Sequence, residues 1–141
     1  MSSEQARRAA IADALHSGAI KLLRMVRSED AAAGIGPAQL SALSVLVFMG
    51  EKTVGELAAL EQVRAPTMSR IADGLVERQL VQRHSATTDR RRVRLAVTAE
   101  GRKLLLAGKD RRVRALAKRL EAFTAGELTT LKEAARLIER L

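Results

Sequence analysis

Residues 53–105 decide the fold and read TVGELAALEQVRAPTMSRIADGLVERQLVQRHSATTDRRRVRLAVTAEGRKLL. Apolar residues in the first half recur every three or four positions, which predicts a short helix, a turn at Val63-Arg64-Ala65 and a second helix from Pro66 to about Gln79. Two β-rich runs follow, at 81–85 and 93–97, separated by a polar segment that is typical of a turn. Helix, turn, helix and hairpin in this order predict a winged helix-turn-helix unit.

The chain on either side of this unit reads as helical. We expect helices over 8–27 and 37–48 before it, and a long helix from Thr98 to about 123 and a last helix beginning after Thr124 behind it. Four apolar residues of the last helix are expected to point inward: Leu128, Leu131, Ala135 and Ile138. The predicted fold class is mainly α with a small β-hairpin (α+β), formed as one domain over residues 1–141.

Composition excludes several kinds of site. The 141 residues contain no Cys and only two His, so a disulfide, a thiolate site and a multi-His metal site are excluded, and we expect neither metal nor cofactor. Two Phe with no Tyr or Trp cannot form a stacking platform for single-stranded nucleic acid. With no apolar run of about 18 residues and no signal-peptide pattern, we expect a soluble, cytoplasmic protein without a membrane partner.

The net charge of +9 is localised in the middle of the chain. Residues 64–94 hold eight cations against three acids, and residues 95–120 hold eight against two. A positive field that is concentrated in one region indicates a polyanionic partner more strongly than a scatter of charges does.

The helix that begins at Pro66 has an exposed face suited to a DNA groove. At 3.6 residues per turn, Met68, Ile71 and Leu75 share one face, whereas Pro66, Ser69 and Arg70 project from the opposite one, with Thr67 at its flank. Small residues allow close approach to a major groove, hydroxyls bind phosphates or bases, and Arg binds guanine in a bidentate manner. The alternative is a merely solvated helix face.

Three consecutive arginines, Arg90, Arg91 and Arg92, lie at the expected tip of the hairpin. Their mutual repulsion is relieved by a polyanion, and a narrow minor groove is one such environment. Asp89 is placed to pair with an arginine and to fix the shape of the tip. The alternative is a charged turn that promotes solubility.

These residues resemble the MarR (multiple antibiotic resistance regulator) family in the spacing of GELA, TMSRIADGL, DRR and VTAEGRKLL. The resemblance implies a homodimer, with a winged helix-turn-helix DNA-binding lobe at 37–97 and a helical dimerisation region at 1–34 and 98–141. The DNA-binding residues that it implies are Arg64, Ala65, Pro66, Thr67, Ser69, Arg70, Arg90 and Arg91, with Asp89 bracing the wing. The chain departs from the family pattern at Arg64, where a small N-cap is usual, and at Gln79, where Gly is usual and a left-handed conformation is expected.

Further candidates are less specific. The candidate phosphate contacts outside the helix that begins at Pro66 are Thr53, Arg92, Arg102 and Lys103. His16 is a candidate to line an effector pocket, with a surface or interface position as the alternative. Four other residues are expected in the core, with effector contacts as the alternative: Phe48, Phe123, Met25 and Met49. The basic residues from Lys109 to Arg119 are expected to form a solvated face, with an anionic effector bound between helices as the alternative.

The predicted function is a dimeric, sequence-specific regulator of transcription that binds double-stranded DNA at a pseudo-palindromic operator. The resemblance implies that it is a repressor released by a small-molecule effector. The alternative is a winged-helix binding module for RNA, protein or an anionic surface. The sequence shows no catalytic constellation and no glycine-rich phosphate loop, so we expect no enzyme.

Overall fold

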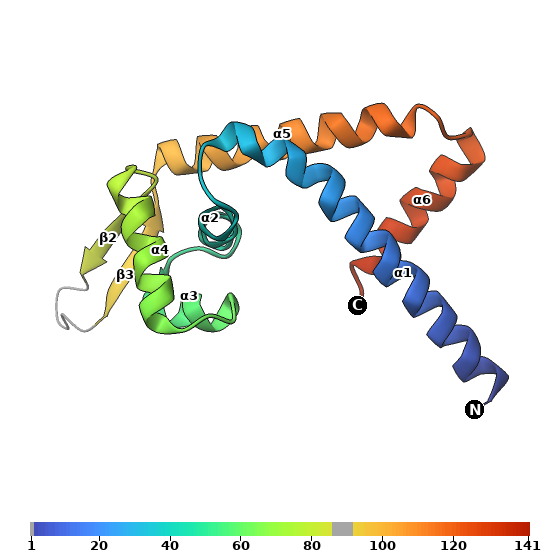
Figure 1. The fold of residues 1–141 in the computed structure, drawn as a ribbon, viewed down its shortest axis with the longest axis horizontal. Coiled ribbons are helices and arrows are strands. Elements are labelled where there is room, and N and C mark those ends of the chain that lie inside the picture. Colours follow the sequence, from blue (N-terminus) through green and yellow to red (C-terminus); the bar gives the residue numbers. More distant parts are fainter. Residues whose placement is uncertain (1, 86–91) are drawn as a thin grey trace.

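The computed structural model describes residues 2–85 and 92–141, which form a lobe at one end and a long helical arm at the other (Figure 1). Its helices and strands are α1 (Ser3–Arg27), the 3-10 helix η1 (Ser28–Ala33), α2 (Pro37–Met49), β1 (Lys52–Thr53), α3 (Val54–Leu60), α4 (Ala65–Glu77), β2 (Val81–Ser85), β3 (Val93–Val97), α5 (Ala99–Leu120) and α6 (Ala125–Ile138). The predicted fold class, mainly helical with a small β element, is confirmed.

Local capping signals set where most helices begin. The predicted capping boxes at Thr53 and Thr124 are both formed. Each Thr hydroxyl accepts a hydrogen bond from the backbone N–H three residues on, and the Glu carboxylate at that position accepts one from the backbone N–H of the Thr. Pro37 opens α2 as expected. A third box at Ser2 starts α1 at Ser3, five residues before the predicted start at residue 8.

The sheet has three antiparallel strands in the order β1-β3-β2. The two predicted hairpin strands are confirmed, with Val81 opposite Val97 and Ser85 opposite Val93. The third strand, β1, was not predicted: it consists of two residues and pairs Lys52 with Leu95. This pairing fixes the start of α3 on the edge of the hairpin, because Thr53 is both the last residue of β1 and the N-cap of α3.

The core lies in the lobe. Five side chains from five different elements are fully buried there: Leu43, Leu57, Met68, Leu95 and Leu105 (the last with 1% exposure). Burial of a side chain of this size stabilises a fold by roughly 1.5–3 kcal/mol. The core therefore unites α2, α3, α4, β3 and the first turns of α5 around one centre.

The arm lacks such a core within the single chain. Neither α1 nor α6 has a buried residue, and the predicted inward direction of Leu128, Leu131, Ala135 and Ile138 is wrong for this chain alone because all four are exposed. The predicted core positions of Phe48, Phe123 and Met49 are also wrong: their exposed fractions are 60%, 44% and 56%. Met25 is only partly buried. Helical periodicity identifies an apolar face correctly, but it does not say whether the same chain covers that face.

Candidate nucleic-acid interface

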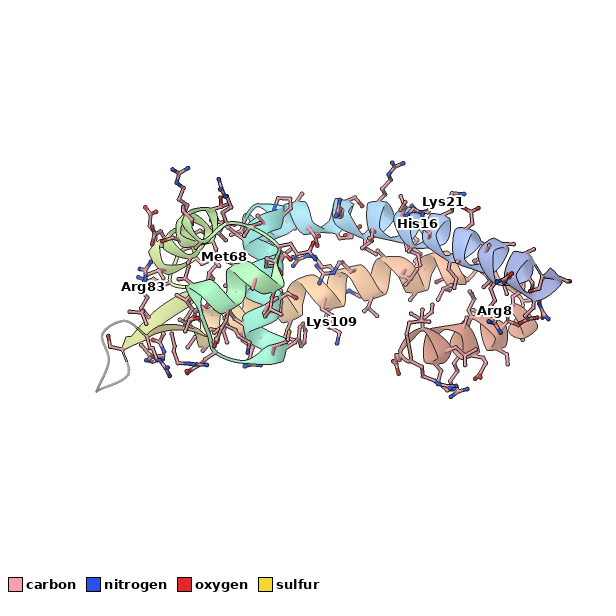
Figure 2. The ribbon with its side chains drawn as sticks, turned by 90° about the horizontal axis from the view of Figure 1, so that it is seen from below. Arg8, His16, Lys21, Met68, Arg83 and Lys109 are labelled. Atoms are coloured by element: carbon pink, nitrogen blue, oxygen red, sulfur yellow. The ribbon has the colours of Figure 1, made fainter. Side chains whose placement is uncertain are left out.

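Helix α4 is held in the lobe by one face. Met68, Ala72 and Leu75 are buried on it, and α4 packs against both α2 and α3; Figure 2 shows Met68 inside the lobe. Ile71, which was predicted on the same face, is partly buried. This packing fixes the rotation of α4 about its axis and therefore fixes which side chains face the solvent.

The opposite face of α4 is exposed at its N-terminal end. The predicted DNA-facing residues Arg64, Ala65, Pro66, Thr67 and Arg70 are all exposed there. Ser69 differs, since it is half-buried and does not project fully as predicted. Arg64 is the N-cap, as the resemblance implied, and its side chain makes no capping hydrogen bond. The structure thus brings five of the six helix candidates together on one exposed surface.

The Thr98 side chain and the backbone of Gln79 hold the chain that follows α4. Gln79 has a positive φ of 60°, so the predicted left-handed conformation is confirmed. The Thr98 hydroxyl donates to the Gln79 carbonyl at 2.7 Å and accepts from the Gly101 N–H at 3.0 Å. Thr98 therefore ties the end of α4 to the start of α5 with one side chain.

Two contacts that the sequence did not suggest connect α4 to its surroundings. The Arg83 guanidinium on β2 forms an ion pair with Asp73, an exposed acid of α4. This pairing offsets a negative charge that would repel a phosphate. The Arg78 guanidinium donates to the Gly34 carbonyl, which follows η1. Each contact joins residues that are far apart along the chain, so no local pattern could have indicated it.

The base of the hairpin forms a concave surface beside α3. Asp89, Arg90 and Arg91 lie outside the described residues, and their roles remain predictions. Arg92 is exposed. A concavity of about 600 Å³ is lined by Thr53, Val54, Gly55, Glu56, Arg92, Val93 and Arg94. It brings together Arg92 and Thr53, two of the predicted phosphate contacts.

The polar groups of this concavity are already hydrogen-bonded in part. The Thr53 hydroxyl accepts from the Glu56 N–H at 3.1 Å, and the Thr53 N–H donates to the Glu56 carboxylate at 2.9 Å. That backbone hydrogen bond lowers the pKa of Glu56 below its ordinary value. Arg94 donates to the Glu51 carbonyl at 3.0 Å. These hydrogen bonds therefore hold Thr53 and Arg94 in place within the concavity.

Comparisons with known proteins agree with this geometry. A profile of the MarR family matches residues 33–92, from the end of η1 to the residue before β3. An uncharacterized HTH-type transcriptional regulator of Mycobacterium bovis is 33% identical over 130 residues, covering 92% of this chain and 91% of the relative. The chain belongs to the MarR family.

A further relative and a solved structure resemble part or all of this chain. The HTH-type transcriptional repressor MdtR of Bacillus subtilis is 37% identical over 68 residues, which cover 48% of this chain and 44% of MdtR. The solved structure of a MarR family protein from Bacillus stearothermophilus superposes with a TM-score of 0.80 at 26% identity and covers 99% of this chain and 96% of its own. The winged helix-turn-helix lobe and the helical arm thus both match known members.

The remaining predicted site residues of this MarR family protein lie outside α4. Arg102 and Lys103 are exposed at the start of α5 and line a shallow concavity of about 500 Å³. His16 is exposed on α1, in the arm (Figure 2). Residues 2–85 and 92–141 contain no group of three or more His, Asp or Glu side chains that could hold a metal ion.

Within the part of the chain that the structure describes, no single helix is long and apolar enough to cross a membrane. Two segments, Ser3–Ala33 and Pro37–Met49, are long and apolar enough only when they are taken together, and a bend of 91° separates them.

Proposed function

We propose that this MarR family protein binds a pseudo-palindromic operator in double-stranded DNA as a homodimer and represses transcription until a small-molecule effector releases it. The general role, that of a DNA-binding regulator of transcription, follows from family membership. The observation that carries the proposal is the exposed N-terminal end of α4, where Thr67 and Arg70 project from a helix whose other face is buried. A regulator of this kind acts in the cytoplasm, with the DNA, and needs no catalytic residue.

The exposed apolar residues of the arm support the homodimer. The large apolar side chains there that are at least 39% exposed include Ile11, Leu15, Ile20, Leu22, Leu23, Val113, Phe123, Leu128, Leu131, Leu137, Ile138 and Leu141. Apolar surface on this scale is unusual for a soluble monomer and is typical of a protein–protein interface. A second copy would cover the arm and present two α4 helices, which predicts half-site centres about one helical turn of DNA apart.

Effector release and repression extend the proposal further. The repressor MdtR of Bacillus subtilis matches about half of this chain, which favours negative control over activation. His16 is the residue of α1 to test first for effector binding. Its substitution by Ala should leave DNA binding intact and remove the response to an active ligand, once footprinting has identified a regulated gene and its ligand.

The DNA interface is tested with purified dimer and the operator found by genomic footprinting. Arg70→Ala should weaken operator binding by roughly 5- to 100-fold, which corresponds to the loss of one bidentate base contact, and should blunt base preference. Arg92→Ala should weaken binding to all sequences. It should also reduce by about one the slope of the logarithm of the binding constant against the logarithm of salt concentration (the salt slope). Arg140→Ala removes the same charge from the end of the chain and is the matched control.

Two results would count against the proposal. One is operator affinity that is unchanged at moderate salt in both Arg70→Ala and Arg91→Ala. The other is an operator affinity no higher than the affinity for duplex DNA of random sequence, because phosphate contacts alone do not distinguish one sequence from another. The second result would instead favour a winged-helix module that binds RNA, protein or an anionic surface.

A further inference from the structure

We propose that the basic face of α5, where it meets η1, is a binding site for a small polyanion carrying two or more carboxylate or phosphate groups. The site is separate from the exposed end of α4 and does not depend on DNA binding. It is a concavity of about 670 Å³ lined by Glu29, Arg111, Arg114, Ala115, Lys118 and Arg119. Four cations therefore face a single carboxylate.

The neighbouring basic residues of α5 have partners within the chain. Lys109 Nζ lies 5.8 Å from the centre of the Phe48 ring, at a cation–π distance. The Arg112 guanidinium lies 2.6 Å from the Asp30 carboxylate of η1, and both side chains are about a quarter exposed. These two residues are accounted for by contacts, which leaves the four cations of the concavity to explain.

The described residues supply no comparable partner for those four. Within residues 2–85 and 92–141, no ion pair within 4.0 Å involves Arg111, Arg114, Lys118 or Arg119. The Nε of Arg111 is also inaccessible to solvent and has no hydrogen-bond acceptor in that part of the chain. A buried N–H group without an acceptor is rare in native proteins, so Arg111 has hydrogen-bonding capacity that the described chain does not use.

The spacing of the cations favours a ligand with several charges. Arg111, Arg114 and Lys118 stand at i, i+3 and i+7 of α5, so they form one row about 10 Å long. Like charges three or four residues apart destabilise a helix, and a polyanion along the row would remove that repulsion. Guanidinium groups bind carboxylate and phosphate oxygens in a bidentate manner. None of the six lining residues is aromatic, so charge would select the ligand.

The basic row and the apolar stripe of α5 lie on different sides of the helix. At 3.6 residues per turn, the apolar residues Val113, Leu116 and Leu120 lie about 160° around α5 from the basic row. A partner that buries the apolar stripe therefore leaves the basic row on the other side of the helix. Glu29 reaches the basic row from η1, on the same chain.

Direct titration of the full chain without DNA tests the proposal. Pyrophosphate and citrate are titrated into the wild-type dimer by calorimetry at constant ionic strength, so that general screening is the same throughout. Saturable binding of either is expected, and the stronger of the two distinguishes a phosphate from a carboxylate ligand. Arg111→Gln and Arg114→Gln should each raise the Kd about 10-fold or more, and Arg140→Gln, with the same loss of charge, should not.

Three outcomes would overturn the proposal. The first is the absence of saturable binding of either anion to the wild type, and the second is an unchanged Kd in both variants. The third is unchanged anion binding together with a smaller salt slope for random duplex DNA, which would assign the row to DNA phosphates. Circular dichroism checks that the variants are folded; if Arg111→Gln unfolds, the exposed Arg114→Gln carries the comparison. Since no operator is used, failure here leaves the proposed regulatory function standing.

Discussion

Substitution of Gly101 by Ala should destabilise the protein, although Ala is the better helix former. Gly101 is buried in the first turn of α5. A Cβ there would overlap the Leu80 carbonyl oxygen and lie 2.9 Å from Cγ2 of Val97. The Leu80 carbonyl cannot move freely, because it accepts the Thr98 N–H at 3.0 Å. The clash therefore falls on hydrogen-bonded backbone rather than on a flexible side chain.

The magnitude follows from two opposing effects. Ala in place of Gly stabilises a helix by about 0.8–1.0 kcal/mol. Overpacking a filled site costs typically 1–3 kcal/mol, and straining the bond to the Leu80 carbonyl adds about 0.5–1.5 kcal/mol. We therefore expect Gly101→Ala to lower the free energy of unfolding by about 0.5–3.7 kcal/mol.

Urea unfolding followed by circular dichroism measures this effect, at one fixed protein concentration because the stability of a dimer depends on it. Gly126→Ala is the matched control: Gly126 is also in the first turn of a helix, and a Cβ there would meet nothing within 4 Å in this chain. Gly126→Ala should raise the free energy of unfolding by between zero and about 1 kcal/mol. If Gly101→Ala proves as stable as Gly126→Ala, the close approach of α5 to the Leu80 backbone is wrong.

Three further predictions concern single contacts. Gln79→Gly should stabilise the protein by about 0.5–1 kcal/mol in urea unfolding, because glycine relieves the positive φ; a loss of stability would mean that the Gln79 side chain contributes more than its strain costs. A double-mutant cycle of Asp30→Ala and Arg112→Ala should give a coupling of about 1 kcal/mol, and additive effects would exclude a real ion pair. The depressed pKa of Glu56, caused first by the Thr53 N–H, stabilises the folded protein above the ordinary pKa of 4.5, and this contribution is lost as pH falls through the folded pKa. Melting curves of Glu56→Gln should therefore depend less on pH below about 5, and equal pH dependence in both proteins would contradict the cap.

Features determined by local sequence were predictable from it. The capping boxes at Thr53 and Thr124 and the hairpin strands each depend on residues within a few positions of one another, so short patterns indicate them. The exposed end of α4 could be predicted for the same reason, because helical periodicity alone separates Met68 from Arg70. Ser69 lies between the two faces, and packing against the lobe decides its burial.

Features determined by distant residues were not predictable. The strand β1 is only two residues long and exists because Lys52 and Leu95 pair across the lobe. The ion pair of Asp73 with Arg83 spans 10 positions, and that of Asp30 with Arg112 spans 82. Phe48 was misplaced because an apolar residue near the end of a helix does not show, from sequence, whether another element covers it.

The absence of a buried residue in α1 has a consequence for the order of folding. This helix leaves the ribosome before the lobe does, yet within its own chain it has little to pack against, and a helix gains most of its stability from packing. The lobe, whose buried side chains lie between residues 33 and 105, finds its contacts within one chain. Helix α1 should therefore be synthesised before the lobe but become stable after it, and the interval before a second chain arrives is when α1 is most open to proteolysis.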